Sequence, residues 1–159
     1  MEQPQAQSIN WITMRTRIKD WQENHRGWLA ELKRCQGVDD IADLPAYYRL
    51  IQGYANPGRI AERGAYLLPW LPHREGAKPI GASLRSAKIS EMRLFQMMRS
   101  EYPKDIELLR RLVQQAEPTV DWGQFGPLLQ FWGKHSKRRI LEQYFLDDNE
   151  GKNSEGDKS

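Results

Sequence analysis

The chain has 159 residues, of which 39% are hydrophobic and 28% charged, and its formal net charge is +3. This composition is ordinary for a globular protein, and no apolar run approaches the roughly 20 residues needed to cross a bilayer. The opening MEQPQAQSIN lacks the basic and apolar regions of a secretory signal, and a single cysteine, Cys35, excludes an internal disulfide. We therefore expect a cytoplasmic protein with no membrane contact.

The positive charge is unevenly distributed along the chain. From Asp147 onward, five acidic residues and two lysines give the tail a net charge of −3, so the remainder carries +6. A moderately basic body suits a polyanionic partner, although many basic proteins bind none. Charge therefore indicates nucleic acid as one candidate partner without selecting it.

The N-terminal half predicts a succession of short helices. Ser8 is a plausible N-cap for the first, a second pattern follows Asn24, and Pro45 occupies the first turn of a third. The Asn56-Pro57-Gly58 turn separates this third helix from another helical pattern over residues 59–68.

Residues 72–82, with the sequence PHREGAKPIGA, are the main predicted surface loop or linker because they are rich in proline, glycine and charge. Beyond them, Ser83 is expected to cap a helix that reaches about Arg99 and turns Met92 inward. A further apolar stripe predicts a helix that begins at Lys104 and stops at Pro118.

Two more helices complete the pattern. The first starts at or after Asp121, an N-cap candidate, but contains Gly126-Pro127, so it is either kinked or starts near Gly126. Ser136 is expected to cap the final helix. No alternating run of β-branched residues predicts a strand.

These elements predict an all-α fold, a compact helical bundle of about eight helices in two packed groups without a sheet. A chain of 159 residues suffices for one domain or for two small lobes that share an interface. The expected organisation is a flexible N-terminus (1–8), an N-terminal helical lobe (9–71), a loop or linker (72–82), a C-terminal helical lobe (83–146) and an acidic disordered tail (147–159).

The strongest chemical signal is a set of basic residues, because phosphate contacts need long cationic side chains spaced along a backbone. The alternative is a solvated helix face with local ion pairs, such as Glu107 with Arg110 or Arg111. For the cluster as a whole, both interpretations stay open. The set comprises Arg110, Arg111, Lys134, His135, Lys137, Arg138 and Arg139, supplemented by Arg34, Arg49, Arg59 and Arg63.

The aromatic residues favour packing over chemistry. Trp21, Trp28, Trp122 and Trp132 fall on apolar faces, so core packing is favoured over base stacking. Trp70 lies between two prolines and is expected to be half exposed, as at a protein interface.

Residues suited to catalysis or metal binding form no recognisable pattern. His25, His73 and His135 are far apart, and none has the spacing of a ligand pair. Cys35 is expected to be a buried, inert thiol. With no glycine-rich phosphate loop and no dinucleotide fingerprint, the sequence predicts a non-enzyme with no catalytic residues, no metal site and no cofactor.

A series of short motifs carries a resemblance to a known family. The segment LPAYYRLIQ at 44–52 is followed by RLFQ at 93–96, LRRL at 109–112, AEP at 116–118, DW at 121–122 and WGK at 132–134. Their order and approximate spacing closely resemble the CasB family, the small subunit of the type I-E CRISPR surveillance complex called Cascade. The resemblance spans about residues 9–146.

The resemblance implies a non-catalytic protein of antiviral defence. Two copies would lie side by side in Cascade, with the backbone and large subunits as partners, along the groove where CRISPR RNA pairs with target DNA and the displaced strand runs. Binding without sequence specificity through a basic surface would stabilise the R-loop. The alternative is a protein-interaction scaffold, in which Trp70, Tyr54 or Tyr66 docks partner subunits and the basic patches are incidental.

The family's basic positions carry over to this chain one by one. Arg34 matches a basic position before the first loop, and Arg59 matches one after the Asn-Pro turn. Arg111 matches the second arginine of the LRRL motif, and Lys134 the lysine of WGK. The resemblance implies that these four contact nucleic acid. Further nucleic-acid-binding candidates, at positions that vary in the family, are His135, Lys137 and Arg138.

Overall fold

The computed structural model describes residues 9–54 and 58–147. Within this part of the chain, nine α-helices and two 3-10 helices account for the secondary structure, with an isolated bridge between His73 and Val120 and no strand. The predicted all-α fold is confirmed. The predicted flexible N-terminus, most of the Asn56-Pro57-Gly58 turn and the acidic tail beyond Asp147 lie outside the described residues. None of the described helices is both long and apolar enough to span a bilayer.

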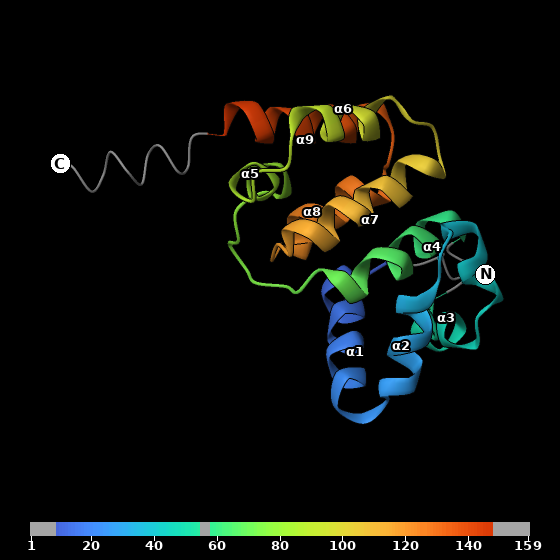
Figure 1. The fold of residues 1–159 in the computed structure, drawn as a ribbon. Helices are drawn as coiled ribbons and strands as arrows, with labels where there is room; N and C mark the ends of the chain where they lie inside the picture. The colour runs from blue at the N-terminus through green and yellow to red at the C-terminus, as the bar shows by residue number, and fades with distance from the viewer. Residues whose placement is uncertain (1–8, 55–57, 148–159) are drawn as a thin grey trace, which may run out of the picture.

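The helices are arranged in three tiers (Figure 1). One end is formed by α1 (Trp11–Asn24), α2 (Arg26–Arg34) and α3 (Pro45–Leu50). The middle contains α4 (Gly58–Leu67), α7 (Lys104–Ala116) and α8 (Trp122–Gln130). The other end contains α5 (Ile80–Ser86), α6 (Glu91–Arg99) and α9 (Lys134–Leu146). The 3-10 helices η1 (Val38–Asp43) and η2 (Leu68–Trp70) flank α3 and α4.

One apolar core extends through all three tiers, from Ile9 to Tyr144. Helix α1 packs on α2 and α8, α6 on α7, and α5 along α9. Because this core is continuous, it does not mark a boundary between an N-terminal and a C-terminal lobe. The division of the chain into two lobes with a linker therefore stays a prediction.

Gly126 and Pro127 both lie inside α8, and Gly126 is required by a close contact with α1. A Cβ atom at Gly126 would overlap the indole of Trp11, which stacks on Trp122 with ring centroids 5.5 Å apart. Glycine therefore allows α1 to approach α8 closely. Helix α8 starts at Trp122 and runs through Pro127, so the prediction of a start at or after Asp121 is confirmed and a start near Gly126 is excluded.

The predicted helix from Ser83 to Arg99 is wrong, because the chain turns sharply between α5 and α6. Ile89 N–H donates to the Leu84 carbonyl (3.0 Å) and Lys88 N–H donates to the Arg85 carbonyl (2.9 Å), while Lys88 has a φ of 66°. These two bonds are a Schellman motif, with Ile89 and Leu84 as its buried apolar contact. The motif is hard to recognise in the sequence because a lysine occupies the left-handed position that glycine usually takes.

Ser90 then caps α6 by accepting a hydrogen bond from Arg93 N–H (3.2 Å). In this register Met92 points outward and is 80% exposed, so its predicted inward orientation is wrong.

Two further predicted caps are wrong. Asn10, not Ser8, caps α1 by accepting from Thr13 N–H at 3.0 Å. Gly133 precedes α9, whereas Ser136 is buried and donates from its hydroxyl to the carbonyls of Leu128 (2.6 Å) and Phe131 (3.1 Å). The Ser136 hydroxyl thus donates to backbone carbonyls at the end of α8, and it does not cap α9 as the sequence pattern predicted.

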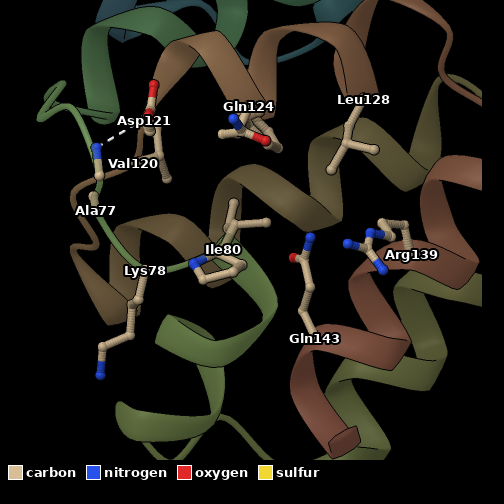
Figure 2. Close-up of a pocket in the computed structure, with 12 residues that line it drawn as sticks. Ala77, Lys78, Ile80, Val120, Asp121, Gln124, Leu128, Arg139 and Gln143 are labelled. Carbon is tan, nitrogen blue, oxygen red and sulfur yellow. Dashed lines mark hydrogen bonds between the residues drawn. The ribbon is translucent and has the colours of Figure 1, made fainter. Parts of the chain in front are cut away.

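Asp121 is the predicted cap that the structure confirms, and it also holds the surface loop. Its Oδ1 accepts from Gly123 N–H (2.8 Å) and its Oδ2 from Gly76 N–H (3.0 Å), the bond drawn in Figure 2. The Gly76 bond is the main reason that the pKa of this carboxyl is lower than usual. Because α5 begins at Ile80, the predicted loop of residues 72–82 ends at Pro79, and the Asp121 side chain connects this loop to α8.

We expect Asp121→Ala to destabilise the protein by about 1–2 kcal/mol, because both backbone donors lose their acceptor. Urea unfolding at pH 7 measures the loss, with Glu75→Ala on the same loop as the control. A carboxyl with a lowered folded pKa stabilises fully above its unfolded pKa of about 3.9, and this stabilisation is lost as the pH falls through the folded pKa. The urea midpoints of the parent protein and of Asp121→Ala should therefore approach each other as the pH falls below about 4. Equal urea midpoints at pH 7 would contradict the assignment.

Candidate nucleic-acid interface

Most of the predicted nucleic-acid-binding residues are exposed near helix ends. Arg34 lies in the last turn of α2, Arg59 in the first turn of α4, and Arg111 on the outer side of α7. The other exposed members lie in the first two turns of α9 and are Lys134, His135 and Arg138. Their exposure leaves these side chains accessible to a partner.

One group of cations gathers between α2 and α7. Lys33, Arg110 and Arg111 line a cavity of about 270 Å³, which we call the α2–α7 pocket. Its other lining residues are Gln36, Tyr66, Trp70, Glu107 and Gln114. The Arg110 guanidinium lies 4.0 Å from the Tyr66 ring centroid, and the Lys33 ammonium lies 4.9 Å from that of Trp70. Burial lowers the pKa of Arg110.

A second group of cations surrounds Tyr102. The guanidinium carbons of Arg59 and Arg63 lie 5.1 Å and 5.8 Å from its ring centroid. Arg63 is buried and donates to the carbonyls of Leu129 and Gln130, each at 3.0 Å. Arg63 therefore holds α4 against the end of α8, and Arg59 is the member of this group that faces solvent.

Among the predicted site residues, Lys137 is the one whose charge has a carboxylate partner in the described structure. Its ammonium lies 2.8 Å from Asp105 Oδ2 and donates to the Ser100 carbonyl at 2.7 Å. Asp105 Oδ2 also accepts from the indole N–H of Trp132 at 2.9 Å. The side chains of Lys137 and Asp105 are 15% and 3% exposed. Contact between Lys137 and nucleic acid stays a prediction, while its role in neutralising a buried carboxylate is visible.

The predicted residues thus fall near two places along α7. The first turns of α4, α7 and α9 lie at the same end of the molecule, the right-hand end in Figure 1, so Arg59 and Lys134 share that end. Arg111 lines the α2–α7 pocket in the second half of α7, and Arg34 directly follows another lining residue, Lys33. Two of the predicted residues thus lie at one end of the molecule, and two lie in or beside the α2–α7 pocket.

The interpretation of local ion pairs is wrong for its named example. Glu107 accepts from Val38 N–H at 3.2 Å and, among the described residues, forms no ion pair with Arg110 or Arg111. Arg139 does have a local partner, Glu142, three residues further along α9 (3.2 Å). The neighbouring arginines of α7 therefore lack the carboxylate partner that sequence spacing suggested.

The exposure of the aromatic side chains tests their predicted roles in core packing and in docking. Trp21 and Trp122 are buried in the core, and Trp28 and Trp132 pack against it, as predicted. Trp70 is half-buried, also as predicted. Tyr66 is not a docking residue, because it is 1% exposed and its hydroxyl donates to the Gln36 carbonyl at 2.7 Å.

Cys35 and His73 have hydrogen-bond partners that do not suit a catalytic nucleophile and its base. The Cys35 thiol is buried and donates to the Gly37 carbonyl (3.1 Å), and burial raises its pKa, which disfavours the reactive thiolate. His73 Nδ1 accepts from Trp122 N–H at 3.0 Å. Within residues 9–54 and 58–147, no three His, Cys, Asp or Glu side chains are grouped as metal ligands would be.

Another cavity, of about 400 Å³, lies between the surface loop, α8 and α9 (Figure 2). Ile80, Val120 and Leu128 line it, with Arg139 and Gln143 on the α9 side. None of the seven predicted nucleic-acid-binding residues lines this cavity. This cavity is therefore not part of the predicted nucleic-acid-binding surface.

Of the cations that line the α2–α7 pocket, the sequence placed Arg110 in the basic set without assigning it a nucleic-acid contact, and it left Lys33 out of that set. Each is the inner member of a basic pair whose outer member, Arg34 or Arg111, was selected. The pairs themselves were the available signal, since consecutive helical residues differ by about 100° in direction. In both of these pairs one cation is closer to the core and the other is exposed.

Comparison with known proteins decides the family. The chain is 33% identical over 144 residues to the CRISPR system Cascade subunit CasB of Escherichia coli strain K12, a match that covers 81% of this chain and 90% of the relative. The chain belongs to the CasB family. No protein-family model matches it.

The fold is shared with a member of a solved complex. A chain in the crystal structure of E. coli Cascade bound to a PAM-containing double-stranded DNA target superposes with a TM-score of 0.78 and 28% sequence identity. The match covers 88% of this chain and 99% of the other. The structural similarity therefore agrees with the membership of the CasB family that sequence identity shows.

Proposed function

We propose that this protein is a non-catalytic small subunit of a type I-E CRISPR surveillance complex that binds nucleic acid without reading its sequence. The observation that carries the proposal is its likeness, over 99% of the matched chain, to a chain of E. coli Cascade bound to double-stranded DNA. The exposed cations supply the chemistry, because long cationic side chains neutralise backbone phosphates whatever the base sequence.

The proposed role is to stabilise the R-loop. Exchange of a DNA duplex for an RNA–DNA heteroduplex is nearly balanced in free energy, so contacts to the strand backbones can shift it toward the open state. Arg34, Arg59, Arg111 and Lys134 are the proposed contacts to the target and displaced strands, with support from His135 and Arg138. Such binding is electrostatic and should weaken steeply as salt increases.

The proposed partners are the Cascade backbone and large subunits, a second copy of this chain, CRISPR RNA and target DNA, within the cytoplasm. Large apolar side chains are available for subunit contact, since Met92 is 80% exposed and Phe131 71% exposed. These side chains also favour the second candidate function, a protein-interaction scaffold whose basic patches are incidental.

A gel-shift experiment with the isolated protein separates the two functions. We expect retardation of single-stranded and duplex oligonucleotides at low salt, and its loss at moderate salt. Absence of retardation at low salt would favour the scaffold. The same mixtures, incubated with Mg²⁺ or Mn²⁺, should contain intact oligonucleotides; metal-dependent cutting would contradict a non-catalytic subunit.

A further inference from the structure

The α2–α7 pocket contains a buried positive charge without an acceptor. Arg110 is 7% exposed, its Nη1 is fully buried, and no described residue accepts a hydrogen bond from it. The Tyr66 ring supports the guanidinium from one side at 4.0 Å. A cation–π contact offsets part of the cost of burial, but it leaves the N–H donors of Nη1 unsatisfied.

A second buried donor lines the same pocket. The indole Nε1 of Trp70 is buried and also lacks an acceptor among the described residues. The Lys33 ammonium lies 4.9 Å from the Trp70 ring centroid, and Arg111 adds a third cation to the lining. The one carboxylate of the lining, Glu107, accepts a hydrogen bond from Val38 N–H. The lining of the pocket therefore holds three cationic side chains and one carboxylate.

We propose that the α2–α7 pocket is a binding site for a phosphate group. The donors expected to contact it are the Arg110 guanidinium, the Trp70 indole N–H and the Lys33 ammonium. Guanidinium and ammonium groups are the usual protein partners of phosphate, and an unpaired buried guanidinium gains most from an oxyanion. A volume of about 270 Å³ has room for a phosphate with several waters.

The charge around the pocket favours a phosphate over a protein carboxylate. Exposed Arg34 directly follows Lys33, and exposed Arg111 follows Arg110, so the cations continue beyond the pocket as a repeating polyanion requires. Lys33, Gln36 and Gln114 are long side chains whose rotamers can open the approach to the two buried donors. If the proposed function holds, the phosphate belongs to a nucleic-acid strand that the outer arginines guide.

The indole N–H resonance of Trp70 reports directly on this pocket. In ¹⁵N-labelled full-length protein the resonance is identified by its absence in Trp70→Phe. Titration with inorganic phosphate, with chloride keeping the ionic strength constant, should shift it saturably. Lys33→Gln should weaken the apparent affinity about fivefold to tenfold, as expected for loss of one charged hydrogen bond. Lys19→Gln, which removes an exposed cation from α1, should leave the affinity unchanged.

Arg110→Met should abolish the phosphate-dependent shift, and the Lys33→Gln result decides the question if that variant does not fold. Absence of a saturable shift in the parent protein would overturn the proposal. A shift with a glutamate-rich peptide but none with phosphate would also overturn it and would assign the pocket to a protein carboxylate.

A single-stranded oligonucleotide identifies the source of the phosphate. A shift of the same resonance that Lys33→Gln weakens would support a strand phosphate, whereas a shift with inorganic phosphate alone would support a site for the free ion. The readout depends on Trp70 and Lys33, which are not among the residues assigned to the strand contacts. Failure of the phosphate titration therefore refutes the pocket and leaves the gel-shift result, and the proposed function, standing.

Discussion

Replacing Arg34, Arg59, Arg111 and Lys134 together with alanine should reduce the affinity for duplex target DNA while leaving the fold intact. All four side chains are exposed and none forms a hydrogen bond or ion pair from its charged group to another described residue, although Arg59 lies over Tyr102. Their loss therefore removes little internal structure. The helix content and the unfolding midpoint should remain close to those of the parent protein.

The salt dependence gives this prediction its magnitude. Each phosphate contact contributes about one unit to the slope of log affinity against log salt, so four contacts should lower the slope by about four units. Extrapolated from 1 M to 0.1 M salt, the same relation corresponds to a loss of about ten-thousandfold in affinity. Titration of the reconstituted complex with target DNA at several salt concentrations measures both quantities.

A control variant must remove the same amount of charge. Alanine at four exposed cations of other surfaces has the same effect on net charge, and the proposed interface predicts a much smaller loss of affinity. The control positions are Lys19, Arg26, Arg74 and Arg85. Equal losses in the two variants would mean that net charge, not the assigned surface, governs binding.

The second large effect is expected at Asp105, where substitution with alanine should destabilise the fold by about 3–5 kcal/mol. The carboxylate is almost fully buried and is the shared partner of the Lys137 ammonium and the Trp132 indole N–H. Its removal leaves a largely buried ammonium without a counter-ion. Since small domains have only about 5–15 kcal/mol of total stability, urea or thermal unfolding should detect the change easily.

The double variant Asp105→Ala with Lys137→Met isolates the electrostatic part of this loss. With no ammonium left to compensate, part of the stability should return relative to Asp105→Ala alone. A single variant that unfolds like the parent protein would refute the pairing. Lys137→Met alone separates the two roles of the lysine, because a strand contact predicts a smaller salt slope and a purely internal ion pair predicts only lower stability.

Local signals were sufficient where sequence neighbours decide the outcome. Pro45 begins α3 and Asp121 caps α8 as predicted, because a first-turn proline and a capping carboxylate act on their own helix. Lys88 was not recognised as a helix end, because a lysine takes the left-handed position in a turn that two backbone hydrogen bonds and the burial of Ile89 and Leu84 stabilise. Ser136 failed as a cap because α9 already starts at Lys134, and the buried Ser136 hydroxyl donates to the carbonyls of Leu128 and Phe131 instead.

By itself, the sequence determined the helical class, the family resemblance and the presence of basic residues in neighbouring pairs. Only the tertiary structure decided which member of each pair is accessible. Consecutive helical residues point about 100° apart, so the packing of α7 against its neighbours directs Arg110 inward and leaves Arg111 outside. The same packing brings Asp105 to Lys137, and this explains why similar basic positions differ between internal partner and open surface.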